Sequence, residues 1–394
     1  MRPINNSKLR FVKFIALILL ISTPMVFALP PDPDNAALLY YQAFILYQKP
    51  DDMVQDMIAD LAKGKIEPST QTAEFIENQK AVIGLAVTAA ELPKCSWGLR
   101  YSEGLSMEMP YLSQVRHLTW LIIADARTIA ANGDYELAIE RCLTARKFAQ
   151  QMAKEPTFIS LLLGISIERH TNECIQDILS SATIDLETLQ RLKAQLGELD
   201  SRIKPIEFFL ETEQEVMAMY ITPGKIQEAL PLLWFEDEAK FNKARELILS
   251  ADEQFYKRNA DYYNEYWAAI FSSVKMPYEQ AYGSLEKAEK KVDWKDENPD
   301  AVIASQLAPA TMKVYNLDVN KKTLSNAIRT AVDIYIIKAK TGQLPGVLPV
   351  GLPGDLFSGK DFEYKKTVNG FVLRCQGKDL EKGEIHEYEF KVKK

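Results

Sequence analysis

Apolar residues recur at helical spacing through most of this chain, from Asp34 to about Thr341. A period of three to four residues places one apolar stripe on each helix, and such stripes must pack against one another. Asp34 is a candidate N-cap for the first helix, and Asp51 or Asp52 for the second. The pattern therefore predicts a mainly α fold, built as an irregular bundle of helical hairpins.

One segment interrupts this pattern. Residues 93–110 have no periodicity and contain two prolines, glycines and Trp97. A break of this kind within a helical body is either a surface connector or a loop that packs over a groove. The large ring of Trp97 favours packing.

After Gly342 the pattern changes from helical to alternating. Asn369-Gly370 separates the first two of three short alternating stretches, and this dipeptide is a strong signal for a tight hairpin. The stretches are 362–364, 371–373 and 388–390. Two helices, about 299–316 and 319–341, are expected before them. We therefore predict an α+β arrangement, with a helical domain at 29–298. A long helix with a small three-stranded antiparallel sheet follows at 299–394.

The first 28 residues have the layout of a cleavable signal peptide. Four basic residues precede an apolar run at 14–21, and Val26-Phe27-Ala28 offers the side chains that a signal peptidase reads. The alternative is a retained membrane anchor, but the run is shorter than the roughly 20 residues of a spanning helix, and Pro24 interrupts it. The sequence predicts cleavage after Ala28, export to the periplasm or beyond the cell, and no stable membrane span afterwards.

Loss of this segment would leave 43 basic and 54 acidic residues, a net charge of −11. Nucleic acid and anionic lipid are poor partners for such a chain, because each phosphate contact needs a lysine or arginine. An envelope protein or another extended ligand is the expected partner.

Residues 118–153 resemble one unit of a tetratricopeptide repeat. Gly133 is placed to end one helix and Asp134 to cap the next, while Tyr135 and Ala138 would wedge the two helices together. A solenoid needs at least three such units, and no period is visible elsewhere. A single helical hairpin is therefore favoured over a repeat array.

The C-terminal segment resembles the globular part of type II secretion major pseudopilins. The resemblance covers about 75 residues and rests on a helix containing Tyr335, on Gly342-Gln-Leu-Pro345, on Asp355-Leu-Phe-Ser-Gly359, on the aromatic strands and on Gly377-Lys-Asp379. It implies a pseudopilin-like head. The N-terminal cut site and assembly helix of that family are missing here, which disfavours a filament subunit.

Some pseudopilins bind calcium in the loop after the strand that ends in Gly-x-Asp. The corresponding residues would be Asp379, Glu381 and Glu384, and carboxylate oxygens are the ligands that calcium requires. Lys378 and Lys382 lie among them, so solvated loop charges are the alternative. Calcium is the one cofactor that the resemblance suggests.

Much of the chain also resembles a family of uncharacterised exported bacterial helical proteins. The similar runs include Asp34-Asn-Ala-Ala-Leu-Leu-Tyr40, Cys95-Ser-Trp97-Gly98 and Phe357-Ser-Gly359-Lys360. This resemblance implies an architecture and a compartment but no activity.

The four cysteines are too few for a disulfide scaffold. Cys142 and Cys174 fall on consecutive helices. If the turn is centred near Glu155, their offset along the axis is roughly 9 Å, too far for a relaxed disulfide. Buried free thiols are the favoured interpretation.

No known catalytic motif is present. The three histidines are far apart and form no zinc signature, and no nucleophile elbow or phosphate-binding glycine loop occurs. Glu207, Glu211 and Glu215 share one helix face, where an acidic solvated stripe is favoured over a catalytic pair.

Aromatic residues concentrate at 255–282. Most of them fall on one helical stripe typical of a core face, whereas Tyr262 and Tyr266 are the better candidates for exposure. We therefore predict a non-catalytic protein that binds a partner in a helical groove lined by Trp97, Tyr262 and Tyr266. The alternatives are an envelope acid–base hydrolase, whose glutamates are paired by folding, and an accessory component of a secretion system.

Overall fold

The computed structural model describes residues 32–233, 235, 237–294 and 298–392. The chain divides into a unit Met1–Asp34 and a unit Asn35–Lys394, and only the second is described below. The predicted signal peptide and the cleavage position after Ala28 lie outside the described residues.

Helices make up most of the second unit. They are α2 (Ala36–Leu46), α3 (Asp52–Ala62), α4 (Thr70–Asn78), α5 (Lys80–Glu91), α6 (Leu112–Ala131), α7 (Tyr135–Met152), α8 (Phe158–Ser181), α9 (Leu186–Asp200), α10 (Ile206–Ala218), α11 (Pro223–Ala229), α12 (Glu238–Leu249), α13 (Glu253–Ser273), α14 (Tyr278–Val292), α15 (Val302–Leu307) and α16 (Thr311–Thr341). Strands β1 (Glu363–Thr367), β2 (Gly370–Arg374) and β3 (Glu387–Lys391) follow. The mainly α fold class with a small antiparallel sheet is confirmed.

Short polar side chains begin many of these helices. Asp51 accepts a hydrogen bond from the Val54 N–H, and Asp134 from that of Leu137. Asn35, not Asp34, caps α2. Gly133, between α6 and α7, has φ +89°, a left-handed conformation that favours glycine at a helix end. The boundaries of these helices are thus set largely by local chemistry.

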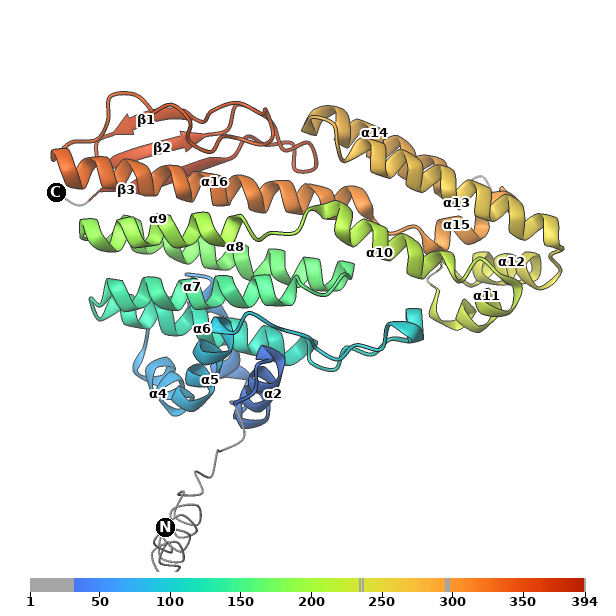
Figure 1. Cartoon of the computed structure of the whole chain (residues 1–394), viewed down its shortest axis with the longest axis horizontal. Helices are drawn as coiled ribbons and strands as arrows, with labels where there is room; N and C mark the ends of the chain where they lie inside the picture. Colours follow the sequence, from blue (N-terminus) through green and yellow to red (C-terminus); the bar gives the residue numbers. More distant parts are fainter. Residues whose placement is uncertain (1–31, 234, 236, 295–297, 393–394) are drawn as a thin grey trace, which may run out of the picture. The chain divides into compact units, whose positions relative to one another are not determined.

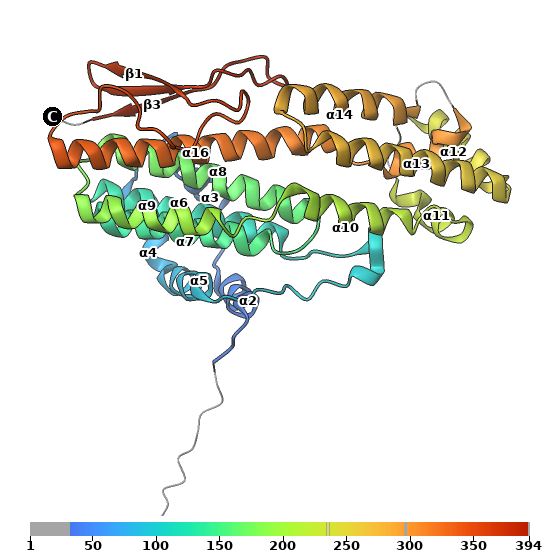
Figure 2. The same cartoon turned by 45° about the horizontal axis from the view of Figure 1, so that its top comes forward.

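The unit is layered around α16 (Figure 1). The sheet lies on one side of α16, and α8 and α9 pack on the other. Helix α7 packs against the other side of α8, and α6 and α5 both pack against α7. Helix α2 contacts α5, and α3 contacts α6. At the far end of the unit α13 pairs with α14 and also contacts α10 and α15 (Figure 2).

Helix α16 runs without interruption for 31 residues. The predicted division of this stretch after residue 316 was wrong. Asp318, between the two predicted helices, lies inside the continuous helix, and its buried carboxylate pairs with Lys321 and Lys322 one turn later. The break falls instead before α16, at Pro309, which lacks the N–H that a continuous helix needs.

The sheet has the order β1-β2-β3, and both pairs are antiparallel. Phe371 lies opposite Phe390, and their stacked rings contact Tyr335 of α16. Gly370 closes the hairpin with Thr367 as its partner in the ladder. A Cβ at this position would lie 1.9 Å from the Phe390 carbonyl oxygen, so close approach of β3 requires the glycine.

We expect Gly370→Ala to lower the free energy of unfolding by about 3 kcal/mol, because the new methyl group would push β3 away from β2. Gly346→Ala is the matched control, since a Cβ there meets no atom within 4 Å, and it should change stability by less than about 0.5 kcal/mol. Urea denaturation followed by circular dichroism measures both. Equal stability of the two variants would contradict the close approach.

The axial estimate for Cys142 and Cys174 was wrong, since their sulfur atoms lie 3.5 Å apart. A Cβ on Gly164 would lie 3.1 Å from the Ala149 carbonyl oxygen and 3.0 Å from the Cβ of Ala153. Gly164, in the second turn of α8, is therefore level with the end of α7. The first turns of α8 project beyond α7, and this shift brings Cys174 level with Cys142.

Candidate functional site

A cleft of about 730 Å³ opens between the end of α5 and helices α7, α8 and α9. Its walls include apolar side chains from three of the helices that form the bundle. Leu161 and Ile165 come from α8, Leu199 from α9 and Phe209 from α10. Clefts of this size and mixed lining are typical of ligand-binding sites.

The floor of the cleft borders a network of buried charges. Arg146, on α7, has no exposed surface, and Glu168, on α8, is 4% exposed. The Arg146 Nη2 atom lies 2.9 Å from Glu168 Oε1 and 2.5 Å from Asp200 Oδ1, while Nη1 donates to Asn172 at 2.6 Å. One guanidinium thus joins α7, α8 and α9. Such a charge is tolerated in the interior only because it is paired on several sides.

Lys321, on α16, continues this network and lines the cleft together with Glu168 and Asp318. Its Nζ atom lies 3.4 Å from Glu168 Oε2 and 3.4 Å from Asp318 Oδ1. Burial disfavours the charged form of Lys321, yet the Glu168 and Asp318 carboxylates outweigh it and raise its pKa. Likewise, burial acts against ionisation of Asp318, but Lys321 and Lys322 lower its pKa.

Two carboxylates from distant parts of the chain therefore converge at the cleft, as the hydrolase hypothesis requires. However, the lowered pKa of Asp318 keeps this carboxyl ionised at neutral pH, so it is not a proton donor there. Glu168 already contacts both Arg146 and Lys321. This arrangement fits a fixed ionic floor better than an acid–base pair, and the hydrolase stays a hypothesis.

Two of the cations that line the cleft lack a carboxylate partner among the described residues. Lys154 donates to the Pro93 carbonyl oxygen, at 2.5 Å, and Lys204 lies 5.1 Å from the centre of the Phe208 ring. Within the described ranges neither forms an ion pair. Burial, together with repulsion from Arg202, lowers the pKa of Lys154. An anionic group of a ligand would relieve this repulsion.

A second hollow of about 970 Å³ lies beside the cleft, between α4 and α5 on one side and α6 and α7 on the other. The two share the lining residues Glu91, Lys147 and Gln195. The two hollows therefore adjoin along α5, α7 and α9, and together we call them the long groove. The Lys147–Glu91 ion pair, at 2.7 Å, lies where the two hollows meet.

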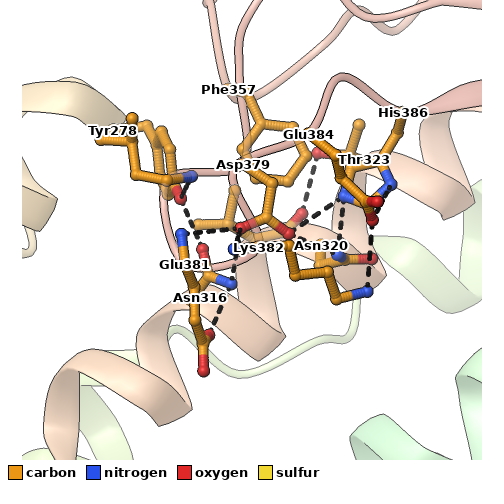
Figure 3. A network of polar contacts seen from close by, with 12 residues as sticks. Tyr278, Asn316, Asn320, Thr323, Phe357, Asp379, Glu381, Lys382, Glu384 and His386 are labelled. Atoms are coloured by element: carbon orange, nitrogen blue, oxygen red, sulfur yellow. Dashed lines mark hydrogen bonds and ion pairs between the residues drawn. The ribbon is translucent and has the colours of Figure 1, made fainter.

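The predicted calcium residues lie elsewhere, in the loop after β2 (Figure 3). Asp379 has no exposed surface, and its carboxylate accepts hydrogen bonds from Asn316, Asn320 and the backbone N–H groups of Glu381 and Lys382. His386 Nε2 lies 3.0 Å from the same carboxylate.

The other two predicted ligands are not arranged with Asp379 around an open position. Glu381 accepts a hydrogen bond from Asn316, and Glu384 is exposed and lies 3.7 Å from both Lys382 and His386. Among the described residues, no group of three or more histidine, cysteine and carboxylate side chains is placed to hold a metal ion. The network instead attaches the loop to α16.

Asp355 occupies an equivalent position in an earlier loop. In both loops the aspartate N–H donates to the carbonyl oxygen five residues later, and a left-handed glycine four residues later, Gly359 or Gly383, donates back to the aspartate carbonyl. The sequences Asp355-Leu-Phe-Ser-Gly359 and Asp379-Leu-Glu-Lys-Gly383 share Asp-Leu-x-x-Gly. This repeated motif was visible in the sequence and was missed.

The three aromatic residues predicted to line a groove do not come together. Trp97 is 3% exposed; its ring stacks on Tyr111 at 4.5 Å, and its backbone N–H donates to Glu155. Tyr266, on α13, is 4% exposed and donates to the Pro309 carbonyl oxygen. The predicted exposure of Tyr266 was wrong, because the segment before α16 covers it. Tyr262 is half-buried and donates to the Lys291 carbonyl oxygen.

The residues of the long groove were not among the sequence candidates. One signal could have indicated the network: Arg146 lies on the same helical face as Cys142, Leu143 and Ala149, all of which are buried. A charged residue on an apolar face must find buried partners.

Comparison with known protein families, curated proteins and solved structures finds no match to this chain. Across the described ranges, no helix combines the length and the apolar character needed to cross a membrane.

Proposed function

We propose that this chain is an exported binding protein of the cell envelope, which holds an extended acidic peptide segment of a partner protein in the long groove. The observation that carries the proposal is that the two hollows adjoin and share the lining residues Glu91, Lys147 and Gln195. A groove open along several helices suits an extended chain better than a compact small molecule. Export rests on the sequence of residues 1–28.

Two lysines that line the cleft support an acidic ligand. Lys154 and Lys204 have no carboxylate partner among the described residues, and the lowered pKa of Lys154 reflects burial and the nearby Arg202. A peptide carboxylate would bind between these cations, while apolar side chains of the peptide would contact Leu161 and Phe209. Gln195 lines both hollows, and its side-chain amide can hydrogen-bond a peptide backbone.

A pair of labelled peptides tests this function by fluorescence anisotropy. One alternates leucine with glutamate and the other leucine with lysine. We expect the acidic peptide to bind more tightly, and the double variant Lys154→Glu/Lys204→Glu to weaken its binding at least about tenfold, equivalent to 1.4 kcal/mol. The ionic floor and the apolar walls are unchanged in this variant.

The matched control is Lys225→Glu/Lys290→Glu, which makes the same change of charge at exposed positions on α11 and α14. It should alter the affinity by less than about twofold, because only long-range attraction is affected. Equal binding of the two peptides, or an equal loss in both double variants, would contradict an acidic-peptide site in the long groove.

A further inference from the structure

Cys142 and Cys174 form the one close pair of sulfur atoms recorded among the described residues. The atoms lie 3.5 Å apart, in the contact between α7 and α8, and neither residue has any exposed surface. Cys95 and Cys375 are also buried, but they lie on the connector after α5 and at the end of β2, respectively. Proximity of two sulfurs on packed helices is the geometric requirement for a disulfide.

The neighbourhood of the pair favours a thiolate at Cys174, whereas the hydrogen bond with Cys174 and burial raise the pKa of Cys142. Arg127, on α6, forms an ion pair with Asp177 of α8 at 2.8 Å, and its positive charge acts on both cysteines. The hydrogen bond from Cys142 is the main reason why the pKa of Cys174 is lowered, and Arg127 adds to it against the effect of burial. In the packed contact between α7 and α8, Cys174 is thus the sulfur that ionises more readily.

We propose that Cys142 and Cys174 are joined by a disulfide in the mature protein, and that this bond fixes α7 to α8, two walls of the cleft. The oxidant is a disulfide, either of a thiol–disulfide oxidoreductase or of a small thiol such as glutathione. The thiolate of one cysteine attacks one sulfur of the oxidant and releases the first thiol. The thiolate of the other cysteine then attacks the cysteine sulfur of the mixed disulfide and releases the second. Two electrons pass to the oxidant, and the two cysteine protons go to its released thiolates.

Since both sulfurs are fully buried, the exchange takes place before the α7–α8 hairpin closes on its neighbours. The bond needs no large change in the fold, because the thiols are already adjacent. This inference does not depend on the peptide-binding proposal, and its test involves no ligand.

Peptide mapping without reduction tests the disulfide. The full chain is refolded in a mixture of oxidised and reduced glutathione, alkylated after denaturation and digested with trypsin. We expect residues 142–146 linked to residues 170–191, and two alkylated thiols in place of four. Reduction should restore four alkylated thiols and lower the melting temperature by several degrees.

Variants separate this bond from chance oxidation. The double variant Cys95→Ser/Cys375→Ser should keep the 142–174 link. Its oxidised form should still melt at a higher temperature than its reduced form. Cys142→Ala should abolish the link and make the melting temperature insensitive to reductant. Alkylation of all four thiols in the unreduced protein, or links that involve Cys95 or Cys375 in preference, would overturn the proposal.

Discussion

Replacing Arg146 with methionine is expected to lower the free energy of unfolding by about 3–5 kcal/mol, the cost of leaving buried charges without their partner. Glu168 and Asp200 would both lose the Arg146 guanidinium, whose Nη2 atom lies 2.9 Å from the Glu168 carboxylate and 2.5 Å from the Asp200 carboxylate. Methionine fills a similar volume, so the loss reports the charge pairing and not a cavity. Urea denaturation at neutral pH, followed by tryptophan fluorescence, measures the change.

Arg329→Met is the matched control. Arg329 pairs with the same aspartate, Asp200, at 3.2 Å, but its side chain is 35% exposed. Solvent screens such a pair, so the loss should not exceed about 1 kcal/mol. Equal stability of the two variants would contradict the claim that the buried ion pairs of Arg146 stabilise the packing of α7, α8 and α9.

The parts of the fold that were predicted correctly depend on local chemistry. Asp134 and Gly133 mark a helix boundary because a cap and a left-handed glycine act within one turn. Asn369-Gly370 predicts the hairpin between β1 and β2 for the same reason. The period of the apolar residues then fixes the class of each element, so a mainly α bundle with a C-terminal sheet follows from the sequence.

The wrong predictions concern contacts between distant segments. Tyr266 lies next to buried positions on α13, but its burial depends on Pro309 and Thr311, more than 40 residues later. The register of Cys142 and Cys174 depends on how far the chain travels between α7 and α8, which periodicity does not encode. The convergence of Glu168 with Asp318 likewise requires α16 to pack on α8.

The residues of the candidate site were not predicted. The expected groove was to be lined by Trp97, Tyr262 and Tyr266, whereas the cleft is lined mainly from α7, α8 and α9 and the second hollow mainly from α4, α5, α6 and α7. Tyrosine and tryptophan are enriched both in cores and at interfaces, so composition alone could not separate the two roles. The position of a charged residue on an apolar helix face, as at Arg146, was the more informative signal.

Replacing Asp379 with alanine is expected to lower the free energy of unfolding by about 3–5 kcal/mol. The donors from Asn316, Asn320, Glu381 and Lys382 would lose their acceptor in a buried site, and each unsatisfied group costs about 1–3 kcal/mol. Partial entry of water limits the sum. Thermal and urea denaturation both measure the loss. Glu384→Ala, in the same loop but exposed, should change stability by less than about 0.5 kcal/mol.

The same site predicts how acid destabilises the protein. Burial raises the pKa of Asp379, but hydrogen bonds from His386, from the Lys382 N–H and from Asn316 outweigh it, so its pKa in the folded state is lowered. A carboxyl whose pKa is lowered by folding stabilises the protein at pH values above its unfolded pKa of about 3.9. This contribution is lost as the pH falls through the folded pKa, where the carboxylate is protonated.

Asp379→Asn isolates this effect, because asparagine keeps the shape of the side chain and does not titrate. The stability difference between wild type and Asp379→Asn should therefore be largest near neutral pH and should shrink as the pH falls below about 4. Urea denaturation at a series of pH values measures it. A difference that stays constant down to pH values well below about 3 would mean that the variant acts through packing alone.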